Sequence, residues 1–229
     1  MLMVVFIALL FTSSSCKKKK EREKWKLPTD VSFKMDINRT VTSGGNLAFT
    51  GGTIILGSFT FDGKRSQADD VFFVNNYSGL SINFDPNSPV AALDFDIPQG
   101  TYSKISVSFQ TYGNAGDDHI VVTGTYKNSV TDSIYPLRFE FEAMEFYTVI
   151  SKDASGSSEI ILDESVASTA TITLDPVFWF QTISTSALDN ATLVNVNGVP
   201  TILITDAKNE DIFDLVIDRV DDATEVVFD

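Results

Sequence analysis

An alternation of apolar and polar residues with a period of two restricts most strongly how this chain can fold. It begins at Val31, where "VSFKMDI" places Val31, Phe33, Met35 and Ile37 on one face of an extended strand. Similar short segments follow up to residue 163, separated by Gly, Asn, Asp and Pro. This pattern predicts a mainly β chain of antiparallel strands, arranged as a sandwich or a barrel.

The same alternation predicts which side chains form the core. Most of the 18 phenylalanines fall on the apolar faces of these segments, and we expect them to be buried there. The chain has no internal repeat of fixed period, which disfavours a solenoid or a propeller. Beyond the first strand, the predicted inward residues are Ile55, Phe59, Phe61, Tyr102, Ile105, Val107, Phe109, Leu137, Phe139 and Phe141.

The last third of the chain has a different pattern. "TITLDPVFWF" reads as a strand, a short helix is expected near residues 185–191, and "TILIT" is a further strand. From about Asn209 to Asp221 the spacing predicts a surface helix, with Asp206 or Asn209 as its cap. The predicted fold is therefore an antiparallel β-sandwich with a C-terminal amphipathic helix packed on the sheet. The apolar stripe of that helix consists of Ile212, Phe213, Val216, Ile217 and Val220.

The only cysteine, Cys16, follows a short apolar run. Residues 2–11 are uninterrupted apolar residues, which as a helix extend about 15 Å, half of a bilayer core. Such a run is too short to span a membrane but has the length of a signal-peptide core, and the small residues Ser13, Ser14 and Ser15 follow it. The alternative is a free cysteine in an apolar N-terminus.

Cys16 directly after this segment resembles the lipobox of bacterial lipoproteins, with Ser13 where leucine is usual. The resemblance implies that the mature chain begins at Cys16 and carries acyl chains there, which together give durable membrane attachment. We expect a signal peptide over 1–15, a lipidated basic tether over 16–29 and a β-sandwich domain over 30–229, in which 175–229 adds short helices and edge strands. No Lys or Arg precedes the apolar run, so we expect a basic stretch upstream of Met1.

Charge is distributed unevenly along the chain. The formal net charge is −14, and residues 17–26 contribute +5, so the remainder carries −19. A body this acidic repels phosphate backbones, which excludes nucleic-acid binding as an expected function. The basic segment suits a tether that is extended by its like charges, or one that contacts anionic lipid.

Several motifs resemble the surface lipoproteins of Bacteroidota, a family to which no chemistry is assigned. They are "FTFDGKRSQADDVFF", "DFDIPQGTYSKISVSF", "PVFWF" and "NEDIFDLVID". The resemblance implies a β-sandwich and an outer-membrane location, lipid-anchored and facing the periplasm or the cell surface. The "IPQGTY" motif also has a structural reading, because Pro98 and Gly100 suit a corner between two strands.

Three consecutive aromatic residues are the candidate ligand contacts. On a strand, Phe178 and Phe180 would face opposite to Trp179, so one face of the strand could be exposed. Exposed aromatic rings can stack on sugars, whereas the structural alternative is a tryptophan buried under the C-terminal helix.

Catalysis is not expected from this composition. His119 is the only histidine and the body has no cysteine, so neither a nucleophilic constellation nor a zinc site is supplied. No cofactor is expected. Calcium is the one metal weighed, because acidic loops offer Asp117, Asp118, Asp206 and Asp211, although none has EF-hand spacing.

Together these observations predict a non-catalytic lipoprotein of the outer membrane that acts as a binding, adhesion or scaffolding module. Its partner is the membrane through the lipid anchor, with a glycan or protein at the cell surface, and we expect a monomer. Two alternatives are a fimbria-like structural subunit, which would donate a strand such as "TEVVFD", and a carbohydrate-binding or carboxylate-pair hydrolase accessory protein.

Overall fold

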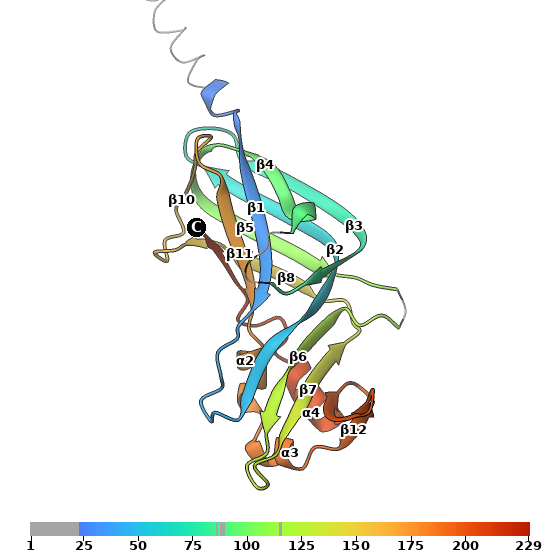
Figure 1. Cartoon of the computed structure of the whole chain (residues 1–229). Helices are drawn as coiled ribbons and strands as arrows, with labels where there is room; N and C mark the ends of the chain where they lie inside the picture. Colours follow the sequence, from blue (N-terminus) through green and yellow to red (C-terminus); the bar gives the residue numbers. More distant parts are fainter. Residues whose placement is uncertain (1–22, 86, 88–89, 115) are drawn as a thin grey trace, which may run out of the picture.

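The computed structural model describes residues 23–85, 87, 90–114 and 116–229. The protein is mainly β, with 54% strand and 12% helix, and its sheets are curled (Figure 1). Cys16 and the expected signal peptide lie outside the described residues. Among the helices of the described part, none is long and apolar enough to cross a membrane.

The strands form two sheets of unequal size. The five-stranded sheet has the order β4 (Asp94–Pro98), β1 (Pro28–Ile37), β11 (Ser168–Leu174), β14 (Glu225–Phe228) and β9 (Lys152–Asp153). The nine-stranded sheet has the order β10 (Ile160–Leu162), β5 (Gly100–Thr111), β2 (Leu47–Arg65), β6 (Ile120–Lys127), β7 (Ile134–Phe141), β13 (Val199–Ile204) and β12 (Leu193–Val196). In that sheet, β3 (Val71–Asn83) also pairs with β2, and β8 (Phe146–Ile150) pairs with β5.

The long strand β2 connects the two halves of the larger sheet. Its first part pairs with β6, and its second part pairs with β3 and β5 (Figure 1). Bulges between Phe49 and Gly51 and between Leu56 and Ser58 shift the register. A bulge reverses the faces of the residues that follow it, so Leu56 is buried and Ile55, predicted to face inward, is only half-buried.

The predicted core is otherwise confirmed. All four inward residues of β1 are buried, and so are those of β5 and β7. Rings from the two sheets meet between them, with Phe33 of β1 4.9 Å from Phe59 of β2 and Phe59 5.1 Å from Phe95 of β4. These centroid distances are those of packed aromatic pairs.

The expectation of purely antiparallel pairing is wrong. Strand β1 pairs with β11 in parallel from Val31 to Ile37, and the pairs β13–β7 and β14–β9 are parallel too. Parallel neighbours need a long crossover between them, and the segment between β1 and β11 contains most of the larger sheet. Both sheets are therefore mixed.

The "IPQGTY" motif is a corner between the sheets. Strand β4 ends at Pro98 in the smaller sheet, and β5 begins at Gly100 in the larger one. Gly100 has a φ of 152°, which favours glycine. The buried Tyr102 donates its hydroxyl hydrogen to the carbonyl of Pro98 at 2.5 Å, which holds the corner closed.

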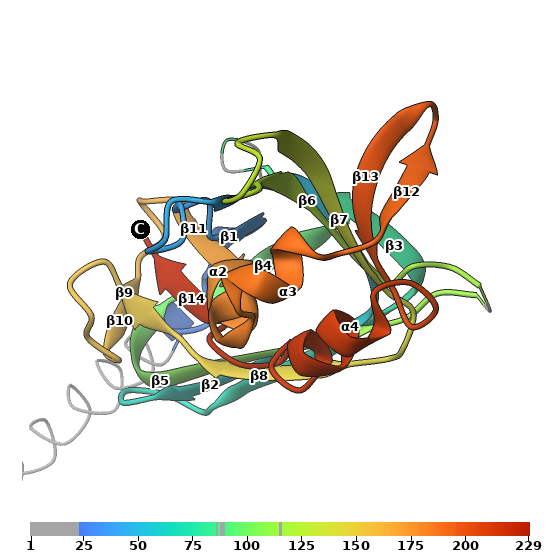
Figure 2. The same cartoon turned by 90° about the horizontal axis from the view of Figure 1, so that it is seen from below.

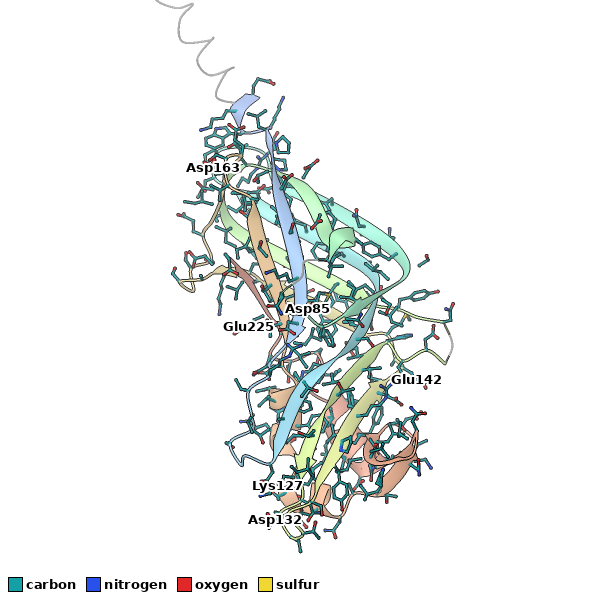
Figure 3. The ribbon with its side chains drawn as sticks, viewed as in Figure 1. Asp85, Lys127, Asp132, Glu142, Asp163 and Glu225 are labelled. Atoms are coloured by element: carbon teal, nitrogen blue, oxygen red, sulfur yellow. The ribbon has the colours of Figure 1, made fainter. Side chains whose placement is uncertain are left out.

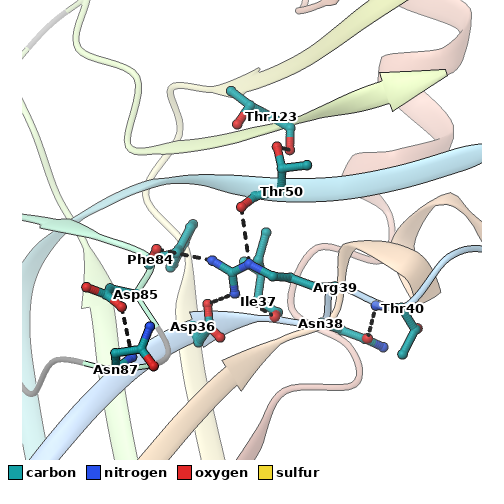
Figure 4. A network of polar contacts seen from close by, with 10 residues as sticks. All are labelled: Asp36, Ile37, Asn38, Arg39, Thr40, Thr50, Phe84, Asp85, Asn87 and Thr123. Atoms are coloured by element: carbon teal, nitrogen blue, oxygen red, sulfur yellow. Dashed lines mark hydrogen bonds and ion pairs between the residues drawn. The ribbon is translucent and has the colours of Figure 1, made fainter. Parts of the chain in front are cut away.

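Arg39 connects three strands where the sheets diverge. Its guanidinium pairs with the carboxylate of Asp36, which is 8% exposed, and donates to the carbonyls of Thr50 at 3.1 Å and Phe84 at 3.2 Å (Figure 4). These partners lie at the end of β1, within β2 and just after β3. One side chain thus fixes the relative positions of the three strands.

The segment after β11 is helical where a strand was predicted. Asp175 accepts a hydrogen bond from the Phe178 backbone N–H and Pro176 is the first helical residue, so the chain forms α2 (Pro176–Trp179) and a 3-10 turn (Phe180–Thr182). The next helix is α3 (Thr185–Asp189), capped by Ser184. A further 3-10 turn, Ala91–Leu93, precedes β4.

The last helix, α4, spans Glu210–Ile217 and is shorter than the predicted 209–221. Asn209 occupies the capping position with a φ of 49°, but its side chain makes no capping bond. Instead it donates to the carbonyls of Thr192 and Leu203 and accepts from the Thr192 N–H, which ties α4 to β12 and β13. Strand β14 follows the helix, so the helix is not the terminal element.

Candidate ligand-binding pockets

The three consecutive aromatic residues lie in different surroundings, because they belong to a helical turn. Trp179 is fully buried, and its indole N–H donates to the carbonyl of Asp222 at 3.3 Å. Phe180 is 3% exposed, and its ring lies 5.2 Å from that of Phe49 in β2 and 6.1 Å from that of Phe139 in β7. Phe178 is half-buried, and the guanidinium of Arg219 lies 4.1 Å from its ring centre. Trp179 is therefore not accessible to a ligand, whereas Phe178 is.

Phe178 and Phe180 line a cavity of about 440 Å³, which we call the aromatic pocket. Its volume lies within the range of about 300–1,000 Å³ that small-molecule sites occupy. Its lining residues come from the loop before β2 and the start of that strand, from strand β6, and from the segment between Asp175 and α3. Figure 2 shows α2, α3 and β6 as ribbons. The lining residues are Thr42, Ser43, Gly44, Asn46, Leu47, Tyr126, Asp175, Val177, Phe178, Phe180, Gln181, Ile183, Thr185 and Leu188.

Hydrogen bonds from side chains hold the walls of the aromatic pocket. Asp175 accepts from Asn38 Nδ2 as well as from the Phe178 N–H, both at 3.0 Å, so the start of α2 is fixed to the end of β1. Tyr126 donates its hydroxyl hydrogen to Asp189 Oδ1 at 2.8 Å, which joins α3 to β6. Burial, followed by the hydrogen bond to Asp189, raises the pKa of Tyr126 to about 12, so it stays a donor at neutral pH.

A second cavity of about 380 Å³, the acidic pocket, collects four carboxylates around apolar side chains. Asp118 and Asp206, two of the four calcium candidates, both line it. The other two do not: Asp117 accepts hydrogen bonds from the backbone and side chain of Asn114, and Asp211 lies in the first turn of α4. The remaining lining residues are Glu140, Phe141, Glu142, Ala143, Thr205, Phe213 and Ile217 (Figure 3 labels Glu142).

Sequence reasoning missed Glu140 and Glu142. Both belong to the polar positions of "RFEFE" in and after β7, a pattern that indicates a strand face without indicating what lies opposite. The loop around Asp206, more than sixty positions further along, reaches them because β13 pairs with β7. Only the tertiary arrangement could have identified this group.

Two carboxylates of the acidic pocket, Asp118 and Glu140, pair with the same cation. Arg138 pairs with Glu140, and its Nη2 lies 3.7 Å from Asp118 Oδ2. Burial, with added repulsion from Glu140, raises the pKa of Asp118 above its ordinary value. Across the described residues no group of three or more His, Cys, Asp or Glu side chains is arranged to hold a metal ion. The pocket can attract positive charge, but its geometry is not a cation cage.

His119 makes only a structural contact within the described chain. The ring is 5% exposed, and its Nδ1 lies 3.0 Å from the carbonyl oxygen of Ala143. Because a carbonyl can only accept, Nδ1 carries the hydrogen. Within the described part, the His119 side chain has no hydrogen bond to a hydroxyl or a carboxylate.

No protein-family model matches the chain, and no curated protein or solved structure matches it either.

Proposed function

We propose that this protein is a non-catalytic binding module held on an outer membrane by lipid on Cys16. In this proposal the body is a β-sandwich, and α4 covers one side of the larger sheet through its apolar stripe. The aromatic pocket is the ligand site. The observation that carries the proposal is this pocket, which combines an apolar floor with polar groups that the fold leaves unused.

The position of the pocket supports this reading. Strand β1, which follows the basic tether, begins at one end of the molecule, where Asp163 also lies (Figure 3). Lys127 and Asp132 lie at the opposite end, and the pocket residue Tyr126 is next to Lys127 in the chain (Figure 3). A domain tethered through β1 would therefore present the pocket away from the membrane.

Labelling with a radioactive fatty acid in a lipoprotein-processing host tests the anchor. The wild-type chain should incorporate label and partition into detergent, because acylation of Cys16 provides the attachment. Cys16→Ala should lose both properties, while the neighbouring Ser14→Ala should keep them. If Cys16→Ala remained labelled and membrane-bound, the anchor proposal would be wrong.

One observation favours a second function, a carboxylate-pair hydrolase at the acidic pocket. The raised pKa of Asp118 is a property of a general acid, and Glu140 lies close enough to contribute to it. Release of nitrophenol from a panel of nitrophenyl glycosides, by the wild type but not by Asp118→Asn, would establish this function. Equal background rates for the two proteins would support the non-catalytic proposal.

A further inference from the structure

The floor of the aromatic pocket is apolar and firmly held. Leu47, Phe180, Ile183 and Leu188 are each no more than 9% exposed, and all belong to the main hydrophobic core. Phe180 is fixed by the rings of Phe49 and Phe139. A floor that is already packed from behind offers a ligand a preformed apolar surface.

The rim of the pocket carries polar side chains without partners in the fold. Ser43, Asn46 and Thr185 make no side-chain hydrogen bond to the rest of the described chain. Gln181 accepts one bond from Arg219 through Oε1, at 3.4 Å, which leaves its amide hydrogens available. The rim therefore offers two hydroxyls and two amides, groups that recognise hydroxyl-bearing ligands.

Charge selects against ionic ligands at this site. No Lys or Arg lines the pocket, and its only carboxylate, Asp175, is engaged by Asn38 and by the start of α2. The guanidinium of Arg219 lies over the ring of Phe178 and donates to Gln181 at the edge of the pocket, so the one cation described there is already engaged. An anion would also be repelled by a body of net charge −19. A cation would instead favour the acidic pocket, which has four carboxylates.

We propose that the aromatic pocket binds an electrically neutral sugar residue. The apolar face of the pyranose ring lies on the floor, and its hydroxyls exchange hydrogen bonds with Ser43, Asn46, Gln181 and Thr185. This inference rests on the proposed function, in that it names the ligand class of the same pocket. A pyranose matches both features, because its C–H groups form an apolar face and its hydroxyls project from the edge.

Calorimetric titration with three sugars that share one ring tests the inference. The probes are N-acetylglucosamine, which is neutral, glucosamine, which is cationic, and glucuronate, which is anionic. A panel of other neutral pyranoses and their short oligomers is titrated alongside. The full chain is purified from whole-cell extracts in a detergent without a sugar head group, because a sugar head group would compete for the pocket. At least one neutral sugar should bind, and its charged analogue should bind about tenfold more weakly or not at all.

Variants of the rim locate the binding. Asn46→Ala and Gln181→Ala should each weaken binding about three- to tenfold, the effect of losing one hydrogen bond. Asn76→Ala, on an exposed position of β3, is the matched control and should leave the affinity unchanged. Hydrogen exchange should show sugar-dependent protection in residues 42–47 and 181–188.

The inference would be overturned if no neutral sugar bound, if the charged analogues bound equally well, or if the rim variants bound like the wild type. Its failure can be told from failure of the anchor. Sugar binding does not depend on lipid, so a wild-type chain that binds sugar without fatty-acid labelling contradicts only the anchor. A chain that is labelled but binds no neutral sugar contradicts only the ligand class.

Discussion

The side-chain hydroxyl of Tyr102 holds together the corner between the two sheets. Its ring is fully buried, and its hydroxyl bridges back to Pro98 at the crossing between the sheets. Burial raises its pKa to about 12, so the hydroxyl remains a donor throughout the neutral range. The corner therefore depends on a hydrogen bond that a phenylalanine could not supply.

We expect Tyr102→Phe to lower the free energy of unfolding by about 1–2 kcal/mol, because the carbonyl of Pro98 loses its donor. Urea denaturation of the full chain measures the loss. Tyr112→Phe is the control, since Tyr112 is 44% exposed and its change should stay within about 0.5 kcal/mol. Equal effects at the two positions would mean that the hydroxyl of Tyr102 does not hold the corner.

Single residues also show which features of the fold could be predicted from the sequence and which could not. The inward faces of β1, β5 and β7 were predicted because strict alternation persists there. Ile55 was assigned to the wrong face because the bulge next to Gly57 shifts the phase, and a Cβ on Gly57 would lie 2.4 Å from the Cβ of Tyr112. The aromatic run was misread as a strand, although Asp175 and Pro176 are a helix-start signal that could have corrected it.

At the level of elements, α4 shows how tertiary contacts set the ends of a helix. The predicted apolar stripe ran to Val220, but the helix ends at Ile217 and Val220 is buried from the turn that follows. Within the helix, Phe213 is 8% exposed, with its ring 5.9 Å from Phe139 and 6.4 Å from Phe141 of β7. The ring of Phe213 thus packs against two aromatic rings of β7.

Phe213→Ala should cost about 3–5 kcal/mol, as expected for removing a large side chain from a packed site. Asp214→Ala, one position further and exposed, should cost less than about 0.5 kcal/mol. Urea unfolding of both variants distinguishes a structural helix from an exposed one. Small and equal effects would mean that the apolar stripe of α4 is available to a partner.

The last strand bears on the fimbria-like alternative. Strand β14 pairs with β11 on one side and with β9 on the other, so it is an interior strand of its sheet. A donated strand has to be exchangeable. If β14 left its sheet, its own side chains Val226 and Phe228, which are buried in the core, would lose their packing. This arrangement favours a self-contained body over a strand-donating subunit.

For the whole molecule, the clustering of acidic groups in the acidic pocket makes the free energy of unfolding depend on pH. The acidic pocket raises the pKa of Asp118, first through burial and then through Glu140. A carboxyl with a raised pKa binds its proton more tightly in the folded state. Ionisation of Asp118 therefore costs more in the folded state than in the unfolded state. The free energy of unfolding falls as the pH rises above 3.8, the ordinary pKa of the group, and the loss is complete above the pKa of the folded state.

Asp118→Asn should accordingly gain stability relative to the wild type as the pH rises from about 3.5 to 7. Asp132→Asn is a control of opposite sign, because Lys127 lowers the pKa of Asp132 and its contribution is lost as the pH falls. Thermal unfolding across this pH range measures both. A stability difference at Asp118 that did not change with pH would contradict the raised pKa.

The whole-molecule arrangement was the least predictable from sequence. Alternation gave a mainly β chain, yet it carries no information on pairing partners, so the parallel ladder between β1 and β11 was missed. The aromatic pocket was missed for the same reason, because residues 42–47, Tyr126 and α3 come together only through pairing of distant strands. Phe178 and Phe180 were identified as candidates, but the rim that gives the pocket its polar character was not.

Whether lipid on Cys16 anchors the protein is decided by the intact mass of the wild type and of Cys16→Ala, both purified from whole-cell detergent extracts. We expect the wild-type chain to begin at Cys16 and to carry the added mass of a diacylglycerol and an N-linked acyl chain, both absent from Cys16→Ala. A chain that begins elsewhere, or one whose mass equals that of its residues alone, would contradict it.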